Sequence, residues 1–236
     1  MSLTFRPCIL IPCYNHGAMM ANVLTRLAPF QLPIIVVDDG SDASTRQTLD
    51  QLATDNAHVT LVRLTHNAGK GAAVIRGLKV CAGAGYTHAV QVDADGQHAI
   101  EDIPQLLALA ERHPQALISG QPIYDDSIPR SRRYGRWVTH VWVWIETLSL
   151  QLKDSMCGFR VYPVAPTLQL VNRVSLGKRM DFDTEVMVRL YWQGHTSYFL
   201  PTRVTYPQDG ISHFDALKDN LLISWMHTRL FFGMLP

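Results

Sequence analysis

Two pairs of aspartates carry the strongest chemical signal in this sequence, and each pair ends a short apolar run. Asp38 and Asp39 end one run, and Asp93 and Asp95 end the other. Short β-branched runs closed by a glycine-containing turn predict buried parallel strands. Ligands of open α/β sheets bind at the carboxyl ends of such strands, so the four carboxylates should meet in one crevice. Their mutual repulsion there requires a cation or hydrogen-bond donors.

The spacing of the second pair suits a divalent cation. Asp93 and Asp95 would lie on the same side of an extended turn and supply two oxygen ligands for Mg²⁺ or Mn²⁺. Phosphate oxygens and waters would complete the coordination shell. A metal ion that bridges this pair to a nucleotide diphosphate is the economical explanation. A solvated loop without metal is the alternative for the same residues.

A glycine-rich basic segment, residues 67–71, precedes a helical pattern. Its backbone N–H groups could bind phosphate at the start of the helix, and Lys70 would add a point charge. The segment is not a Walker A loop, because Gly71 stands where Ser or Thr is required. A plain turn that starts the helix fits the segment equally well.

Strand and helix patterns alternate through the first half of the chain, which predicts an α/β fold with a mostly parallel sheet and helices on both faces. After Ser119 a basic loop leads to a long aromatic helix, a helix near 182–193, a strand-like stretch at 196–205 and a final helix. We expect one domain over 1–236, with a nucleotide-binding half and an acceptor-binding half at 1–120 and 121–236. In the first half, strands are expected at 8–12, 33–38, 58–64, 88–93 and 116–119, and helices at 17–28, 43–54, 70–83 and 101–111.

Composition narrows the classes of partner. The 236 residues include 21 basic and 20 acidic side chains, a balance that gives no electrostatic case for nucleic-acid binding. Four cysteines without a CxxC pair favour a reducing compartment. With neither a signal peptide nor a membrane-spanning run in the sequence, we expect a cytoplasmic protein. Two tryptophan-containing segments, 137–145 and 225–232, fit either peripheral docking on the inner membrane or buried amphipathic helices.

Four motifs together resemble the inverting family 2 glycosyltransferases of GT-A fold, and most closely the dolichyl- or polyprenyl-phosphate sugar transferases. They are the segments 12–15, 37–41, 67–71 and 93–95. Downstream likeness at 157–160, 182–185 and 210–213 extends the resemblance to most of the chain. It implies a metal-dependent transferase that moves a sugar from a UDP- or GDP-sugar to a lipid-linked or other hydroxyl or phosphate acceptor.

The resemblance also implies roles for single residues in a Rossmann-like nucleotide site. Asp38 or Asp39 would accept hydrogen bonds from the base or ribose, and Lys70 would lie near the nucleotide. Asp93 and Asp95 would hold the ribose of the donor and the metal on the diphosphate. Other residues implied at the nucleotide or diphosphate are Pro12, Tyr14, Asn15 and His213.

The sequence departs from the family pattern at three places. His16 stands where many relatives have an acidic residue, and Gln121 stands where the polyprenyl-phosphate enzymes have Arg. Their C-terminal Arg-x-x-Gly-x-Ser-Lys pattern becomes residues 207–213 here, with neither terminal cation. These changes weaken the case for a lipid-phosphate acceptor and leave the nucleotide motifs intact.

A hydroxyl acceptor would require a carboxylate base, whereas a phosphate acceptor is already a nucleophile. Candidate bases are Asp154, Asp183 and Glu185. The last two are two residues apart at a helix start, so they cannot face the same way in a regular helix. Asp154 could instead pair with Arg160 in a purely structural role.

The sequence also fits two other classes of function. A haloacid-dehalogenase-like phosphatase would use Asp93 as its nucleophile, although Gln97 departs from the residue types usual there. A nucleotide-sugar-binding protein without catalysis would bind the donor and transfer nothing.

Overall fold

The alternation of strands and helices expected from the sequence is present, in a sheet that continues into the second half of the chain. The computed structural model describes residues 4–123, 130–204 and 215–235, with the backbone alone at 130–133. The strands are β1 Pro7–Cys13, β2 Ile34–Asp38, β3 Val59–Arg63, β4 His88–Gln91, β5 Leu117–Ile123, β6 Arg160–Pro163 and β7 Ser197–Arg203. The helices are α1 Gly17–Leu27, α2 Ala43–Asp55, α3 Lys70–Gly83, α4 Ile103–Arg112, α5 Arg130–Thr147, α6 Val164–Arg173, α7 Phe182–Trp192 and α8 Ala216–Gly233, with short 3₁₀ helices at Ala28–Phe30 and Ile100–Asp102.

The seven strands form one sheet in the order β3-β2-β1-β4-β6-β5-β7. Neighbouring strands are parallel except for β6, which runs antiparallel to both β4 and β5. The predicted α/β class with a mostly parallel sheet is therefore confirmed. The sequence pattern did not reveal β6 or the helix α6 that follows it.

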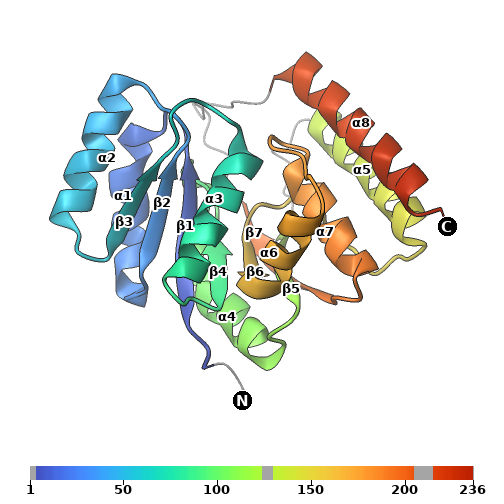
Figure 1. Cartoon of the computed structure of the whole chain (residues 1–236), viewed down its shortest axis with the longest axis horizontal. Coiled ribbons are helices and arrows are strands. Elements are labelled where there is room, and N and C mark those ends of the chain that lie inside the picture. The colour runs from blue at the N-terminus through green and yellow to red at the C-terminus, as the bar shows by residue number, and fades with distance from the viewer. Residues whose placement is uncertain (1–3, 124–129, 205–214, 236) are drawn as a thin grey trace.

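Helices cover both faces of the sheet (Figure 1). Successive residues of β1 point to opposite faces, with Cys8 and Leu10 in one hydrophobic core and Ile9 and Ile11 in the other. Helices α3, α6 and α7 contribute to the first core, and α1 and α4 contribute to the second. Helices α5 and α8 lie side by side beyond α7, at the end of the molecule opposite α2 (Figure 1).

Local signals explain several boundaries near the carboxyl ends of the strands. Asp42 is the N-cap of α2, and its carboxylate accepts a hydrogen bond from the Thr45 N–H at 2.8 Å. Gly40 has a φ of +72°, and a Cβ there would lie 2.4 Å from the His66 carbonyl carbon. The turn after β2 therefore requires glycine for both its conformation and its space.

Within the described ranges, no helix is both long enough and apolar enough to cross a membrane.

Candidate active site

A lysine lies between two aspartates where the two halves of the sheet meet. Lys70, the first residue of α3, places Nζ 2.9 Å from Asp93 Oδ2 and 3.2 Å from Asp183 Oδ2. Asp93 follows β4, and Asp183 belongs to the first turn of α7. Burial alone would lower the pKa of Lys70, but the charges of the two carboxylates outweigh burial and raise the pKa well above its usual range.

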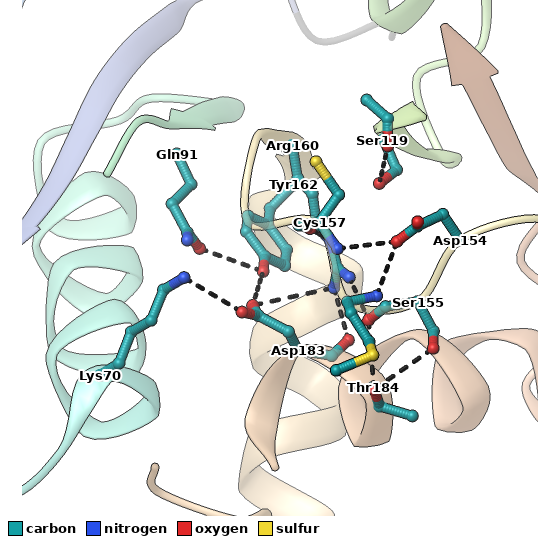
Figure 2. A network of polar contacts seen from close by, with 12 residues as sticks. Lys70, Gln91, Ser119, Asp154, Ser155, Cys157, Arg160, Tyr162, Asp183 and Thr184 are labelled. Carbon is teal, nitrogen blue, oxygen red and sulfur yellow. Dashed lines mark hydrogen bonds and ion pairs between the residues drawn. The ribbon is translucent and has the colours of Figure 1, made fainter. Parts of the chain in front are cut away.

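Two further side chains close a ring of polar contacts around this lysine. The Tyr162 hydroxyl lies 3.4 Å from Asp183 Oδ1 and 3.2 Å from Gln91 Oε1, and Gln91 Nε2 donates to Asp93 Oδ1 at 3.0 Å. Figure 2 shows Lys70, Gln91, Tyr162 and Asp183 converging from separate elements. We call Lys70, Asp93, Asp183, Tyr162 and Gln91 together the Lys70 ring. Because each carboxylate is bound by more than one partner, the ring fixes the charges before any ligand binds.

Gly158 packs directly against the Lys70 ring. A Cβ at this position would lie 2.6 Å from Lys70 Nζ, 2.8 Å from Asp93 Oδ2 and 2.9 Å from Gln91 Nε2. These distances are shorter than real Cβ contacts, so a side chain at Gly158 would occupy space that the ring now fills. The sequence motif at 157–160 contains Gly158 but does not indicate this role, which depends on contacts with distant residues.

A fully buried arginine holds the turn that carries Gly158. Arg160 donates to the carbonyl oxygens of Ser155, Cys157 and Asp183 at 2.6, 2.6 and 2.5 Å (Figure 2). Its Nη1 also lies 3.9 Å from Asp183 Oδ1. Arg160 thereby joins the turn after residue 154 to the start of α7.

Asp154 lies at the edge of this turn and is engaged by the protein. Its Oδ1 accepts from the Met156 and Cys157 N–H groups, both at 2.9 Å, and its Oδ2 accepts from Arg136 at 2.5 Å. Arg136 from α5 binds this carboxylate directly, whereas the hydrogen bonds of the Arg160 guanidinium go to three backbone carbonyl groups.

Glu185 lies away from the Lys70 ring, as the spacing from Asp183 predicts. Its Oε1 accepts from Arg189 at 2.9 Å, and its Oε2 accepts from the Gly177 N–H at 2.7 Å and from Arg229 at 3.1 Å. The side chain is fully buried. These contacts join α7 to α8 and to the loop before α7, so the geometry favours a structural role for Glu185.

The two aspartates of the first pair have different roles: Asp38 is structural, and Asp39 lies at the candidate site. Asp38 is fully buried and accepts from the Ser41 N–H at 2.9 Å and from Arg63 at 3.1 Å, which connects β2 to β3. Asp39 accepts from the N–H groups of Ala68 and Gly69 at 2.7 and 2.9 Å. Burial raises the pKa of Asp39, and these two hydrogen bonds oppose the rise.

The loop after β1 packs against the same edge of the sheet. Pro12 is buried opposite Val37 of β2, and Tyr14 is half-buried. Asn15 has a φ of +53°; its N–H donates to Ser41 Oγ at 3.0 Å and its Oδ1 accepts from the Asp42 N–H at 2.9 Å. The side chain of Asn15 thus fixes the loop beside Asp39, which the sequence motif alone did not show.

Asp95, like Asp93, is partly exposed. Its Oδ1 accepts from the Gln97 N–H at 3.1 Å. The Asp93 N–H bonds His98 Nδ1 at 3.3 Å, and the His98 ring stacks on Phe159 with centroids 5.0 Å apart. Burial would raise the pKa of Asp93, but Lys70 and His98 together hold it well below its usual range. The supporting position of His98 was not predicted from the sequence, because it depends on the packing of Phe159.

The part of the chain that the structure describes contains no group of three or more His, Cys, Asp or Glu side chains that could hold a metal alone. The donor set fits an ion that also takes oxygens from a bound diphosphate, since Mg²⁺ is commonly held by one or two carboxylates plus substrate phosphates. Asp95 is the carboxylate open to such an ion, whereas Asp93 is bound by Lys70 and Gln91. The predicted position of His213 lies outside the described residues.

Comparison with known proteins gives this geometry a family. The family model described as glycosyl transferase family 2 matches residues 8–179. Undecaprenyl-phosphate mannosyltransferase from Micrococcus luteus is 32% identical in an alignment of 168 residues, and the alignment covers 69% of this chain and 68% of that protein. UDP-N-acetylglucosamine–dolichyl-phosphate N-acetylglucosaminyltransferase from Methanococcus voltae is 33% identical in an alignment of 196 residues, and the alignment covers 76% of this chain and 78% of that protein.

Solved structures agree on the fold. Glucosyl-3-phosphoglycerate synthase from Mycobacterium tuberculosis, in complex with Mn²⁺, UDP-glucose and phosphoglyceric acid, aligns over 98% of this chain and 80% of its own with a TM-score of 0.67 at 15% identity. S. aureus TarS 1–349 in complex with UDP-GlcNAc aligns over 96% of this chain and 66% of its own with a TM-score of 0.62 at 16% identity. Both are GT-A enzymes, which confirms the predicted fold. The family match over 8–179 and the named transferases exclude the phosphatase and the binding protein without catalysis. The chain belongs to glycosyltransferase family 2.

Proposed function

We propose that the protein transfers a sugar, with inversion, from a nucleoside-diphosphate donor to a polyprenyl phosphate, with Mg²⁺ or Mn²⁺ on the diphosphate. One observation carries the choice of acceptor. Each carboxylate oxygen of the candidate bases Asp154, Asp183 and Glu185 already accepts a hydrogen bond from the protein or lies in an ion pair with it. Such carboxylates are poorly placed to take a proton from a hydroxyl, whereas a phosphate acceptor needs no base.

The named relatives support the same acceptor class, since both act on a polyprenyl or dolichyl phosphate by name. Gln121, which replaces an expected arginine, is half-buried in β5 and supplies no cation for a phosphate. The competing possibility, a hydroxyl acceptor, would rest on Asp183, which is the candidate base that lies within the Lys70 ring.

The charges of the Lys70 ring and of the neighbouring Arg160 support a metal requirement. Lys70 and Arg160 balance Asp93 and Asp183, so these four described residues bring no net positive charge to a diphosphate. Asp95 adds a negative charge beside them. A divalent ion bound by Asp95 would supply the missing positive charge and stabilise the departing diphosphate as a Lewis acid.

The protein's own residues position the reacting groups. Asp39, held by the N–H groups of Ala68 and Gly69, would contact the base or ribose of the donor, and Lys70, at the start of α3, would lie beside the diphosphate. The Lys70 ring fixes that lysine, so its charge faces the leaving group without reorganisation during the reaction. Gly158 leaves the space that this arrangement needs.

The acceptor is tested by incubating the purified protein with UDP- and GDP-sugars and either polyprenyl phosphate or the matching polyprenol, with products identified by mass spectrometry. We expect a sugar on the phosphate and none on the alcohol. Transfer to polyprenol alone would overturn the proposal and assign Asp183 as the base.

The donor is tested by calorimetric titration of UDP and GDP with and without Mn²⁺. We expect one of the two diphosphates to bind more tightly with Mn²⁺. Equal affinity with and without the ion would overturn the metal requirement and leave the acceptor question separate.

A further inference from the structure

Asp93 and Asp95 lie on one turn, residues 93–98, which we call the acidic turn. Asp93 is fixed by the Lys70 ring, whereas Asp95 is partly exposed and accepts from the Gln97 N–H within the turn. Gly96 has a φ of +70°, so the backbone changes direction directly after Asp95. The position of the Asp95 carboxylate therefore depends on what holds the backbone that follows it.

Helix α1 presents one stripe of side chains to the acidic turn. Met19, Val23 and Arg26 follow one another at intervals of four and three residues, the spacing that puts side chains on the same face of a helix. A Cβ added at Gly96 would lie 3.7 Å from Met19 Cε and 3.7 Å from Val23 Cγ2, which is ordinary contact distance. The acidic turn therefore packs along α1.

Arg26 holds the backbone of the acidic turn from this side. Its Nη1 donates to the Gly96 carbonyl oxygen at 3.2 Å, and its Nη2 donates to the His98 carbonyl oxygen at 3.3 Å. Nη2 also lies 3.2 Å from Glu101 Oε1. One planar guanidinium thus connects two carbonyl groups that both follow Asp95, a geometry that the single ammonium group of a lysine does not reproduce.

The attachment of α1 rests on other side chains. The helix buries Met20, Val23, Leu24 and Leu27 against the sheet, whereas the Arg26 side chain is 34% exposed. Its ion pair with Glu101, which is 71% exposed, adds little stability in such a position. The pair does balance the charge of Arg26, so this arginine adds little repulsion toward a cation at Asp95. What remains for Arg26 is the conformation of the acidic turn.

We propose that Arg26 is a positioning residue for the divalent ion: it keeps the acidic turn in the conformation in which Asp95 meets the ion on the diphosphate. This inference rests on the metal requirement of the proposed function. Replacing a residue that orients a metal ligand commonly lowers metal affinity by about 10- to 100-fold. Because Arg26 holds the backbone and not the carboxylate itself, we expect a loss at the lower end, about tenfold.

The test measures the affinity of the full chain for Mn²⁺ from the EPR signal of the free ion, with saturating UDP or GDP. Arg26→Met keeps an apolar side chain of similar reach and removes both carbonyl contacts, so it should bind Mn²⁺ about tenfold more weakly. Arg26→Lys can donate to one of the carbonyls and should lie between this variant and the unaltered protein. Calorimetry without Mn²⁺ should give all three proteins the same nucleotide affinity, which a general loosening of the site would not.

Two controls separate the carbonyl contacts from other effects of the substitution. Arg112→Met removes an arginine from the last turn of α4, where its Nε donates to the Ala108 carbonyl oxygen of the same helix at 3.1 Å. This variant should bind Mn²⁺ as the unaltered protein does. Glu101→Gln removes the charge of the exposed ion pair and keeps both carbonyl contacts of Arg26, so its Mn²⁺ affinity should stay within about twofold.

Equal Mn²⁺ affinity of Arg26→Met and the unaltered protein would overturn this inference and leave the metal requirement in place. A loss in Glu101→Gln as large as that in Arg26→Met would also overturn it, because the effect would then belong to charge and not to the backbone contacts. Weaker nucleotide binding by Arg26→Met without Mn²⁺ would assign Arg26 a general structural role instead. If the unaltered protein binds no Mn²⁺ with either nucleotide, the metal requirement itself fails, and the role of Arg26 fails with it.

Discussion

Replacing Gly158 with alanine should damage the site while leaving the fold nearly intact. The backbone of Gly158 does not need the left-handed conformation, so alanine can adopt it. The new Cβ would meet Lys70 Nζ, Asp93 Oδ2 and Gln91 Nε2 at 2.6 to 2.9 Å. All three atoms are the ends of side chains, which can retreat at little cost to the packing of the core.

The size of the retreat sets the expected loss of activity. Lys70 Nζ must move by about 0.8 Å to reach the ordinary contact distance of 3.4 Å, and Asp93 Oδ2 must move by about 0.6 Å. Displacements near 1 Å in a catalytic arrangement can lower rates by about 100-fold. We therefore expect kcat/KM to fall by about 100-fold, or about 2.7 kcal/mol of transition-state stabilisation, with a change of less than about 1 kcal/mol in the free energy of unfolding.

Initial rates of transfer and urea denaturation, measured on the same preparation, check both parts. Gly83→Ala is the matched control, because Gly83 ends α3 and a Cβ there meets no atom within 4 Å. This variant should keep full activity. The reasoning would be refuted if Gly158→Ala retained a third or more of the activity, or if it lost activity only because it unfolded.

Asp95→Asn should abolish the gain in UDP or GDP affinity that Mn²⁺ produces, which calorimetry measures; an unchanged gain would remove Asp95 as a metal ligand. Arg179→Met should lower the free energy of unfolding by roughly 2–3 kcal/mol in urea denaturation, since it leaves the fully buried Asp219 carboxylate without its cation. Arg179→Lys should restore part of this loss, and equal stability of all three proteins would contradict the assignment. The depressed pKa of Asp93 contributes stability that is present above its unfolded pKa of about 3.9 and is lost as the pH falls toward the folded value. The difference in unfolding free energy between Lys70→Met and the unaltered protein should therefore narrow below about pH 4, and a constant difference would show that Lys70 does not act through Asp93.

The first half of the fold could be read from the sequence because its signals are local. Short apolar runs mark β1, β2 and β4, and helical patterns follow them; the runs of β2 and β4 lead directly into aspartates. Strand β6 gave no such signal, because Arg160 opens it and Pro163 closes it. Arg160 can be buried because it donates to carbonyl groups of the turn at 155–157 and of α7. No short stretch of sequence contains both Arg160 and all of these partners.

Part of the candidate site was predicted because some of its residues also belong to local sequence motifs. Lys70, Asp93 and Asp183 were all named from motifs, and the structure brings them together. Asp154 and Glu185 were named for their residue type and position, yet each binds an arginine from a distant part of the chain. Spacing reveals which carboxylates share an edge of the sheet, whereas the identity of their cations depends on how α5 and α8 pack.

The Lys70 ring makes the first half of the chain depend on the second half. Lys70 and Asp93 belong to the first 120 residues, whereas Asp183 comes from α7, beyond the last residue matched by the family model. Phe182, next to Asp183, is fully buried and packs so closely on Gly71 that a Cβ there would lie 2.5 Å from it. The position of Lys70 thus depends on a carboxylate that is itself positioned by the packing of α7 against α3. Nucleotide binding and the packing of the second half should therefore stabilise each other, because ordering either one fixes the same lysine.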